Sequence, residues 1–336
     1  MKIAVIGVGY WGPNLVRNLL NNKSVGEVYC FDIDAKRLHN ISQQYPVVKI
    51  VDSYEDILNN PKINGVCIAT PASAHFPLAK MALEHNKHIL VEKPFTVTIH
   101  EAKKLLELVR EKGLKIIVDH IFMYNGAVRK IKQLIESGEI GKILYFDAVR
   151  VNLGLFQHDV NVLYDLATHD ISIMLYLLNK NPKAVSAIGV GHYNTIEDIA
   201  YLTLFFEDNC IAHFHVNWLA PVKVRRILIG GSQKMIVYDD METVEKIRVY
   251  DKGVEIKSKE GIYKTLVQYR TGDMYAPKFD TTEPLSMLVN EFVDAMKNGT
   301  EPLSNGKIGL EIIKILSAAQ KSIKNNGCVV ELKENE

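Results

Sequence analysis

The sequence predicts an α/β fold in which a doubly wound parallel sheet is followed by an α+β domain with a large, mostly antiparallel open sheet. Three observations predict it. The first 120 residues alternate short apolar strand-like runs with helical stretches. Beyond residue 140, several strand-like runs follow one another without helices between them. The length of 336 residues suits two domains, which we place at 1–120 and 121–336, with the terminal helices of the second free to pack back toward the first.

The first domain should consist of βαβ units, because each helical stretch separates two apolar runs. Gly113 follows the last of these helices and suits a helix C-terminus. We expect strands at 2–6, 27–31, 47–51, 65–69, 88–91 and 115–118, and helices at 14–20, 35–44, 54–59, 74–84 and 99–112.

The second domain has a different pattern, in which strands in series predict an antiparallel or mixed sheet. Residues 251–282 lack periodicity and are interrupted by glycine and proline, so we expect a long irregular segment there. We expect helices at 128–137, 162–178, 285–298 and 307–325, and strands at 143–152, 184–190, 199–206, 210–218, 224–230 and 235–238.

The composition excludes several kinds of partner. With 40 basic and 39 acidic side chains, the chain has no basic surplus for nucleic acid or an anionic membrane surface. No apolar run reaches the roughly 18 residues of a membrane span. The four cysteines show no CxxC spacing, and the first residues lead straight into a glycine motif without the pattern of a leader. We therefore expect a cytoplasmic chain.

A glycine-rich turn follows the first expected strand and opens the first helix. This context is typical of a dinucleotide site, where a pyrophosphate binds at a helix N-terminus. Asp32, about twenty residues further on, can accept hydrogen bonds from the ribose diol and would repel a 2′-phosphate, which favours NAD over NADP. Lys36 or Arg37 could still receive that phosphate, and a plain tight turn with a strand-end cap is the alternative. The motif is Gly7-Val8-Gly9-Tyr10-Trp11-Gly12.

A charged pair, Glu92 and Lys93, follows the fifth expected strand and precedes Pro94. The carboxyl ends of parallel strands form the ligand-binding edge of such a sheet. There a lysine could hold a substrate hydroxyl and help to carry its proton while a hydride leaves. A surface Glu–Lys pair is an equally good interpretation of these residues alone.

Asp165 and His169 are four residues apart on an expected apolar helix and should share one face, where a histidine could accept and return an alcohol proton. A pair that merely satisfies itself is favoured by the spacing alone, and the presence of Lys93 reverses that preference. His213 and His215 would share a sheet face, but no third ligand is evident, so we expect no metal site.

These motifs together resemble the Gfo/Idh/MocA family of NAD(P)-dependent sugar and cyclitol oxidoreductases over essentially the whole chain. The resemblance is carried by the glycine motif, by Ala69-Thr70-Pro71 with His75, by Glu92-Lys93-Pro94 and by the run from Asp165 to Asp170. It implies that Lys93 orients the substrate and takes part in proton transfer. It also implies that His169 is the acid/base with Asp165 beside the reacting hydroxyl, and that Thr70, Pro71 and Glu92 line the nicotinamide, with His75 among the cofactor-binding residues.

The substrate is suggested by a second resemblance. The run from Arg150 to Gln157 resembles the branch that acts on nucleotide-linked sugars in bacterial polysaccharide and lipid biosynthesis, which implies oxidation at C3 of a UDP-N-acetylglucosamine-type sugar. A free-sugar or inositol dehydrogenase, a 3-ketosugar reductase and a non-catalytic dinucleotide-binding regulator remain alternatives. Lys93 and His169 argue against the regulator, because a sensor needs no proton-handling pair.

Further candidate contacts surround these motifs. His120 could approach the nicotinamide or simply begin the connection between the domains. Substrate contacts are expected at Tyr124, Arg150, Asn152, Gln157 and His158, although solvated polar positions explain the strand residues equally well. The apolar strands of the second domain suggest burial against another subunit, and the resemblance implies a homodimer or homotetramer through that sheet.

Overall fold

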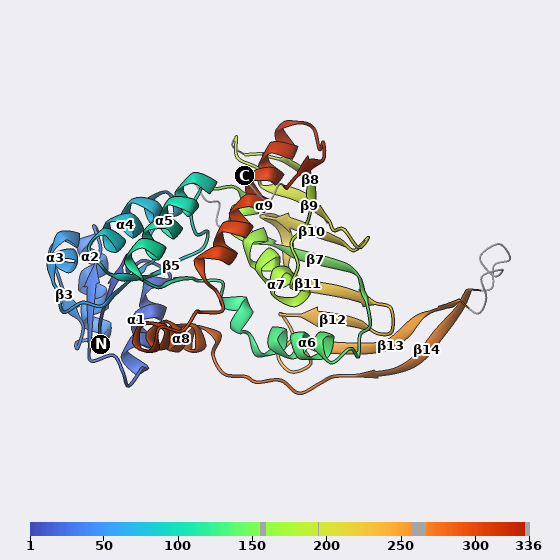
Figure 1. The fold of residues 1–336 in the computed structure, drawn as a ribbon, viewed down its shortest axis with the longest axis horizontal. Helices are drawn as coiled ribbons and strands as arrows, with labels where there is room; N and C mark the ends of the chain where they lie inside the picture. Colours follow the sequence, from blue (N-terminus) through green and yellow to red (C-terminus); the bar gives the residue numbers. More distant parts are fainter. Residues whose placement is uncertain (155–158, 194, 257–266, 333–336) are drawn as a thin grey trace. The chain divides into compact units, whose positions relative to one another are not determined.

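The computed structural model describes residues 1–154, 159–193, 195–256 and 267–332 (Figure 1). The chain forms two compact units. The first consists of Met1–Tyr124 and Thr282–Ser317, and the second of Asn125–Thr281 and Ala318–Glu336. The chain therefore returns to its first unit near its end, and the last boundary falls inside helix α9 (Gly306–Lys324).

The first unit is built on a six-stranded parallel sheet in the order β3-β2-β1-β4-β5-β6. The central strands are buried on both faces, as continuous apolar runs between two helical layers require. This order reverses at β1, so the carboxyl edge of β1 and β4 is where a ligand is expected. The strands are β1 (Lys2–Ile6), β2 (Glu27–Phe31), β3 (Lys49–Ile50), β4 (Gly65–Ile68), β5 (His88–Val91) and β6 (Ile116–Val118).

The helices of this unit begin at recognisable signals. Ser53 forms a capping box with Asp56, and Thr98 forms one with Glu101. Gly113 ends its helix with a left-handed φ of 64°, as its sequence position predicts. The helices are α1 (Gly12–Asn21), α2 (Ala35–Gln44), α3 (Tyr54–Asn59), α4 (Ala72–Glu84), α5 (Ile99–Lys112), the 3₁₀ turn η1 (Ile121–Tyr124) and α8 (Pro284–Asn298).

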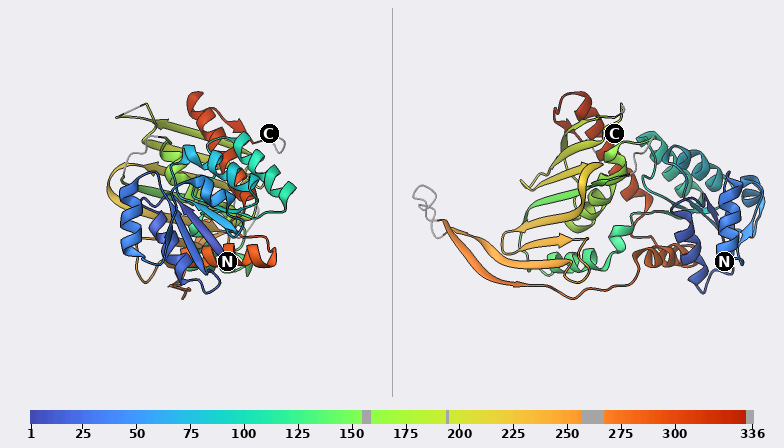
Figure 2. Two further views of the ribbon diagram at one scale, coloured as in Figure 1. Left: turned by 90° about the vertical axis from the view of Figure 1, so that its left-hand side faces the viewer. Right: turned by 180° about the vertical axis from the view of Figure 1, so that it is seen from behind.

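The second unit is built on a nine-stranded sheet in the order β14-β13-β12-β11-β7-β10-β9-β8-β15. Within it β7 and β10 run parallel and the other neighbours run antiparallel, as predicted. Helices α6 (Gly126–Glu136) and α7 (Thr168–Leu178) lie on one face (Figure 2). The strands are β7 (Ile143–Leu153), β8 (Ala184–Val190), β9 (Ile199–Phe205), β10 (Ile211–Asn217), β11 (Leu219–Gly231), β12 (Met235–Asp239), β13 (Ile247–Ile256), β14 (Val267–Tyr275) and β15 (Val330–Glu331).

The expectation of an irregular segment at 251–282 is wrong. Most of β13 and all of β14 lie there as an antiparallel pair that extends beyond the other strands (Figure 1, Figure 2). Gly253 and Gly272 do not break these strands. A Cβ on Gly272 would meet the Asp251 side chain at 2.7 Å, and one on Gly253 would meet Arg270 at 3.2 Å. The two glycines therefore make room for the Asp251–Arg270 ion pair, 3.0 Å long.

No helix in the described ranges is both long and apolar enough to cross a lipid bilayer.

Candidate active site

The glycine motif forms a turn whose close contacts explain two of its three glycines. Gly7 has a φ of +85°, and a Cβ there would lie 2.5 Å from the Ala69 carbonyl oxygen. A Cβ on Gly12 would lie 2.1 Å from the Gly7 carbonyl oxygen, so glycine lets α1 pack against the strand. At Gly9 the nearest atom would be the flexible Arg37 guanidinium at 3.3 Å. The contacts within the chain would therefore tolerate a side chain at Gly9 better than at Gly7 or Gly12. Glycine at this position would instead allow a ligand to approach the backbone closely.

The N-terminus of α1 carries no capping side chain and no acidic residue in its first turn. By contrast, α2, α3 and α5 are capped by Asp34, Ser53 and Thr98. An uncapped N-terminus presents backbone N–H groups and positive partial charge, which fits a pyrophosphate. The glycine turn and this helix end therefore have the donor set that NAD requires.

Asp32 is 6% exposed and fixes the strand ends at this turn. Its Oδ2 accepts a hydrogen bond from the Val8 amide at 2.8 Å, and its Oδ1 accepts one from the Asp34 amide at 2.9 Å. The Arg37 guanidinium lies 3.6 Å from Asp32 Oδ2. A cavity of about 370 Å³ lies beside these residues, and Arg37 is part of its wall. Arg37 is therefore placed where it could contact a 2′-phosphate, the alternative considered in the sequence analysis. The cavity is lined by Val8, Gly9, Tyr10, Pro13, Arg37, Asn40, Ile41 and Gln44.

His75 joins two loops at the same edge of the sheet. Its Nδ1 lies 2.8 Å from the Pro94 carbonyl oxygen and its Nε2 lies 2.9 Å from the Thr70 carbonyl oxygen. The side chain is 1% exposed, so its place is between the loops that follow β4 and β5. The direct cofactor contact expected of His75 is not what this geometry favours, because both ring nitrogens already face backbone oxygens. We interpret His75 as the residue that positions Thr70 and the segment after Lys93.

Glu92 and Lys93 follow β5, and Asp119 and His120 follow β6. Asp119 was not identified from the sequence as a candidate site residue. Its position directly after an expected parallel strand was a signal that could have pointed to the ligand-binding edge. It is 2% exposed, and its Oδ2 accepts a hydrogen bond of 2.8 Å from Trp11 Nε1. Burial raises the pKa of Glu92 well above its usual value, and the charge of Asp119 and a hydrogen bond between the two carboxyls raise it further.

His120 is fully buried next to this acid pair. Burial and the nearby positive charge of Lys93 lower the pKa of His120 to about 3, so the imidazole is neutral. Neither ring nitrogen has a hydrogen-bond partner among the described residues. A buried polar group without a partner is costly, and a ligand amide at this edge could satisfy it. The expected position of His120 beside the nicotinamide stays a prediction, with which the two unpartnered ring nitrogens are compatible.

In the second unit, the stretch 162–178 is helical throughout, as expected, but it is not a single regular α-helix. Residues Leu163–Ala167 form a π-helical turn, η2, and α7 begins only at Thr168. Asp165 lies in this turn, so the simple four-residue spacing to His169 is not that of one regular α-helix. Trp218, itself fully buried, donates a hydrogen bond of 3.0 Å from Nε1 to Asp165 Oδ2. Single π-helical turns are frequent at functional sites, and periodicity does not reveal them.

Two expected substrate contacts are buried in structural roles. Arg150 is 2% exposed and binds Asp170 with two hydrogen bonds of 2.9 and 2.7 Å. Tyr124 is 3% exposed, donates to Glu291 and accepts from the Ser304 amide at 3.2 Å. Both geometries contradict the expected contact, because the polar groups already serve partners inside their own units.

The other expected substrate residues have different outcomes. Asn152 lies on β7 and is partly exposed. Gln157 and His158 lie outside the described residues. In the sheet, His215 stacks on Tyr201 with ring centroids 4.5 Å apart, and Thr203 hydrogen-bonds to His213 at 3.1 Å. The described ranges contain no cluster of three or more His, Cys, Asp or Glu that could hold a metal.

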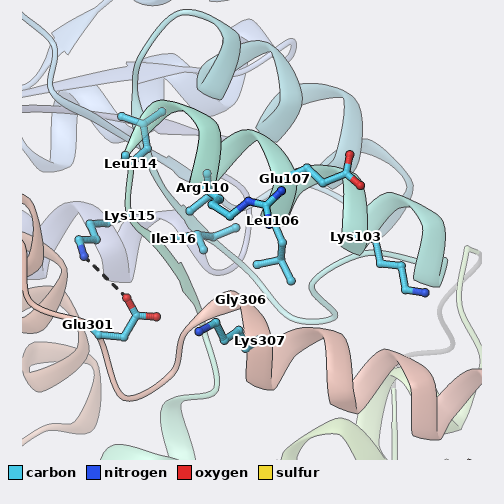
Figure 3. A pocket seen from close by; sticks show the side chains of 12 residues that line it. Lys103, Leu106, Glu107, Arg110, Leu114, Lys115, Ile116, Glu301, Gly306 and Lys307 are labelled. Atoms are coloured by element: carbon cyan, nitrogen blue, oxygen red, sulfur yellow. Dashed lines mark ion pairs between the residues drawn. The ribbon is translucent and has the colours of Figure 1, made fainter. Parts of the chain in front are cut away.

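The first unit also contains a larger cavity, of about 570 Å³, away from the glycine turn. It lies between α5, the start of β6 and the first residues of α9, where Lys115 and Glu301 form an ion pair of 3.7 Å (Figure 3). Its only residue from the parallel sheet, among the described residues, is Ile116, the first residue of β6. The parallel sheet presents its ligand edge at the other end, so this cavity is separate from the candidate active site.

Comparison with known proteins identifies the family to which the chain belongs. The model for an oxidoreductase family with an NAD-binding Rossmann fold matches residues 1–120, and the GFO/IDH/MocA C-terminal domain matches 128–237. An uncharacterised oxidoreductase of Escherichia coli, YdgJ, is 31% identical over 73% of each chain. A UDP-N-acetylglucosamine 3-dehydrogenase of Acidithiobacillus ferrooxidans is 26% identical over 75% of this chain and 78% of its own.

A third relative, the scyllo-inositol 2-dehydrogenase (NAD⁺) of Bacillus subtilis, is 29% identical over 56% of this chain and 57% of its own. Among solved structures, GenD2 from gentamicin A biosynthesis in complex with NAD superposes with a TM-score of 0.83 at 19% identity, over 99% of this chain and 96% of its own. With its NAD-binding Rossmann unit and its matching C-terminal domain, the chain belongs to the Gfo/Idh/MocA family of NAD-dependent oxidoreductases that act on CH–OH groups.

Proposed function

We propose that the protein oxidises the C3 hydroxyl of a nucleotide-linked N-acetylhexosamine, of the UDP-N-acetylglucosamine type, to a 3-keto sugar. The observation that carries the proposal is the placement of Lys93 two residues after the end of β5, at the carboxyl edge of a sheet whose glycine turn fits NAD. The choice of sugar is supported by the similarity to the UDP-N-acetylglucosamine 3-dehydrogenase, which extends over three quarters of this chain.

The cofactor would be held by the carboxyl edge of the first unit. Backbone groups of the Gly7–Gly12 turn, with Tyr10 and Trp11 beside them, would bind the pyrophosphate, and Asp32 would receive the adenosine ribose. Thr70, Pro71, Glu92 and His120 would line the nicotinamide. When bound, NAD supplies the acceptor for the hydride, at C4 of its nicotinamide ring.

The chain's own part in the reaction is to manage one proton. The C3–H bond breaks and its electron pair leaves with the hydride, while the hydroxyl proton passes to Lys93 or His169 and the C3–O bond becomes a carbonyl. Asp165, held by Trp218, would orient the hydroxyl. The products are the 3-keto sugar, NADH and one proton.

An inositol or free-sugar dehydrogenase is the second candidate, favoured by the similarity to the scyllo-inositol 2-dehydrogenase. The matching experiment is an NADH-forming assay with UDP-sugars, free hexoses and inositols. We expect turnover with UDP-N-acetylglucosamine above that with inositols. Because alcohol oxidation by NAD is often unfavourable near neutral pH, a ketone trap or a coupled aminotransferase should accompany the assay. A faster reaction with inositols would select the second candidate, and turnover with no member of the panel would contradict both.

Replacing Lys93 by Ala should separate chemistry from cofactor binding. We expect kcat to fall by at least about a hundredfold, the size of a general acid–base contribution, while the Kd for NAD changes little. Steady-state kinetics and a fluorescence titration with NADH measure the two. Comparable losses in both quantities would contradict the assigned role of Lys93.

We also propose that the protein is a homo-oligomer in which the exposed face of the nine-stranded sheet meets another copy. Several large apolar side chains are exposed on that face. Among them Ile188 is 57% exposed, Val190 51% and Tyr201 39%. Apolar groups exposed on neighbouring strands mark an interaction surface.

A further inference from the structure

A pair of neighbouring acids, Glu92 and Asp119, lies at the candidate active site without a part in the proposed reaction. Asp119 is buried, and Glu92 is half-buried with its Oε1 atom inside the protein. The register of the sheet brings them together. Val91 pairs with Val118 in the parallel β5–β6 ladder, so the next residue of each strand follows at the same level. The Asp119 amide also donates to the Val91 carbonyl at 2.8 Å. The two carboxyls are close enough that a hydrogen bond between them raises the pKa of Glu92.

A hydrogen bond between two carboxyls requires one proton. Within the described residues, no N–H or O–H donor other than this pair's own proton reaches Glu92 Oε1 or Asp119 Oδ1. Asp119 Oδ2 already accepts from Trp11 Nε1, which holds Asp119 as the acceptor. The shared proton therefore belongs on Glu92, and the pair carries one negative charge in place of two.

The pair is tied to the dinucleotide turn through one side chain. Trp11 belongs to the glycine motif and is the residue that precedes α1. The strand order places Asp32 on the β2 side of β1 and Glu92 at the end of β5 on the other side. A dinucleotide whose adenosine ribose is held by Asp32 would therefore extend its nicotinamide toward β4 and β5. The nicotinamide ring is positively charged in NAD⁺ and neutral in NADH. A positive charge near a carboxyl pair favours loss of its shared proton.

We propose that the Glu92–Asp119 pair, fixed by Trp11, releases its shared proton to solvent when NAD⁺ binds and retains it when NADH binds. The pair would thereby match its charge to that of the nicotinamide ring. It would act as a charge-positioning element of the cofactor site and not as the acid or base of the sugar chemistry. The proposal needs cofactor binding alone and is independent of which sugar is oxidised.

Three titratable side chains around the pair, Cys67, His120 and Tyr124, each stay in one form between pH 5 and 9. Burial raises the pKa of the Cys67 thiol and of Tyr124 far above this range, and His120, with a pKa of about 3, is neutral. The charge of Lys93 lowers the pKa of Glu92 and opposes the stronger effect of burial.

The test is calorimetric titration of the intact protein with NAD⁺ and with NADH, without sugar, in two buffers of different ionisation enthalpy at several pH values from 5 to 9. At low pH both complexes keep the proton, and at high pH both lose it. Between these limits NAD⁺ should release up to about one proton more than NADH. In that window the ratio of NAD⁺ to NADH affinity should rise up to about tenfold per pH unit.

Three variants locate the source of the proton. Glu92→Gln and Asp119→Asn each remove the shared proton and should abolish the difference between the two cofactors. Lys93→Met should keep it but move its window to higher pH, because the charge that lowers the pKa of Glu92 is lost. As a matched control, Glu27→Gln changes an acid at the opposite end of β2, where Glu27 pairs with Lys2 and Lys49, and should behave as the wild type.

Two results would overturn the proposal. One is equal proton release with NAD⁺ and NADH in the wild type at every pH. The other is a difference that survives in Glu92→Gln but disappears in Lys93→Met, which would assign the proton to Lys93. Circular dichroism establishes that each variant is folded, and Glu92→Gln, which preserves side-chain volume, decides the question if Asp119→Asn does not fold.

Discussion

At the scale of single residues, Trp218 should affect catalysis through its hydrogen bond to Asp165, a contact that no sequence pattern predicted. Its indole N–H fixes Asp165 in the π-helical turn. A hydrogen bond to a charged group is worth about 1.5–3 kcal/mol. We expect Trp218→Phe, which keeps the aromatic body, to lower kcat about tenfold or more while the Kd for NADH is unchanged. An unchanged kcat would show that Asp165 needs no such support.

Asp32 should govern the choice of cofactor. Its carboxylate would repel a 2′-phosphate, whereas Arg37 beside it would attract one. We expect Asp32→Ala to weaken NADH binding and strengthen NADPH binding, so that their ratio of Kd values changes by at least about tenfold. Arg37→Ala should leave NADH binding nearly unaffected. Fluorescence titration measures both, and an unchanged ratio in Asp32→Ala would argue against ribose recognition by Asp32.

Arg150 illustrates what the sequence could not reveal. An arginine on a strand next to a candidate substrate loop is a reasonable anion-binding residue. Only the fold shows that the guanidinium of Arg150 forms an ion pair with Asp170 in the core. Breaking a buried ion pair by removing one partner costs about 3–5 kcal/mol. We therefore expect Arg150→Met to lower the free energy of unfolding by about that amount, measured by urea denaturation. A loss of sugar affinity with unchanged stability would restore the substrate role.

At the scale of elements, sequence signals succeeded where local chemistry decides the structure. Apolar runs buried on both faces predicted the central parallel strands, and Gly113 marked the end of α5. They failed where tertiary contacts decide. The glycines of β13 and β14 looked like breakers, yet they accommodate an ion pair across the ladder. The π-helical turn adds one residue to a helical turn and leaves the apolar pattern almost intact, so periodicity could not separate it from α7.

Pyrophosphate binding at the uncapped N-terminus of α1 can be tested by introducing one negative charge there. Asn14→Asp places a carboxylate in the first turn, where the helix dipole favours it but a pyrophosphate would be repelled. We expect the Kd for NADH to rise several-fold without loss of stability. The same change at Asn21, the last residue of α1, is the control and should leave NADH binding unaltered. Equal affinities of the two variants would contradict phosphate binding at this helix end.

At the scale of the whole molecule, the 336 residues form two compact units. The net charge of +1 is compatible with binding of a small dianion such as a nucleotide sugar. The exposed sheet face gives a prediction for assembly. We expect the wild type to be a dimer or tetramer by light scattering, and the double change Ile188→Asp with Tyr201→Asp to produce smaller species. Val47→Asp, at a site 71% exposed in the first unit, is the control. A monomeric wild type at micromolar concentration would contradict the proposed interface.

The central claim is hydride transfer from C3 of a nucleotide sugar to NAD, and isotope transfer tests it most directly. UDP-N-acetylglucosamine carrying deuterium at C3 is incubated with the protein, NAD and a ketone trap, and the reduced cofactor is examined by mass spectrometry and NMR. We predict deuterium at C4 of the nicotinamide, one atom per NADH formed, and none with sugar labelled at C4. Reduced cofactor without deuterium from the C3-labelled sugar would contradict the account.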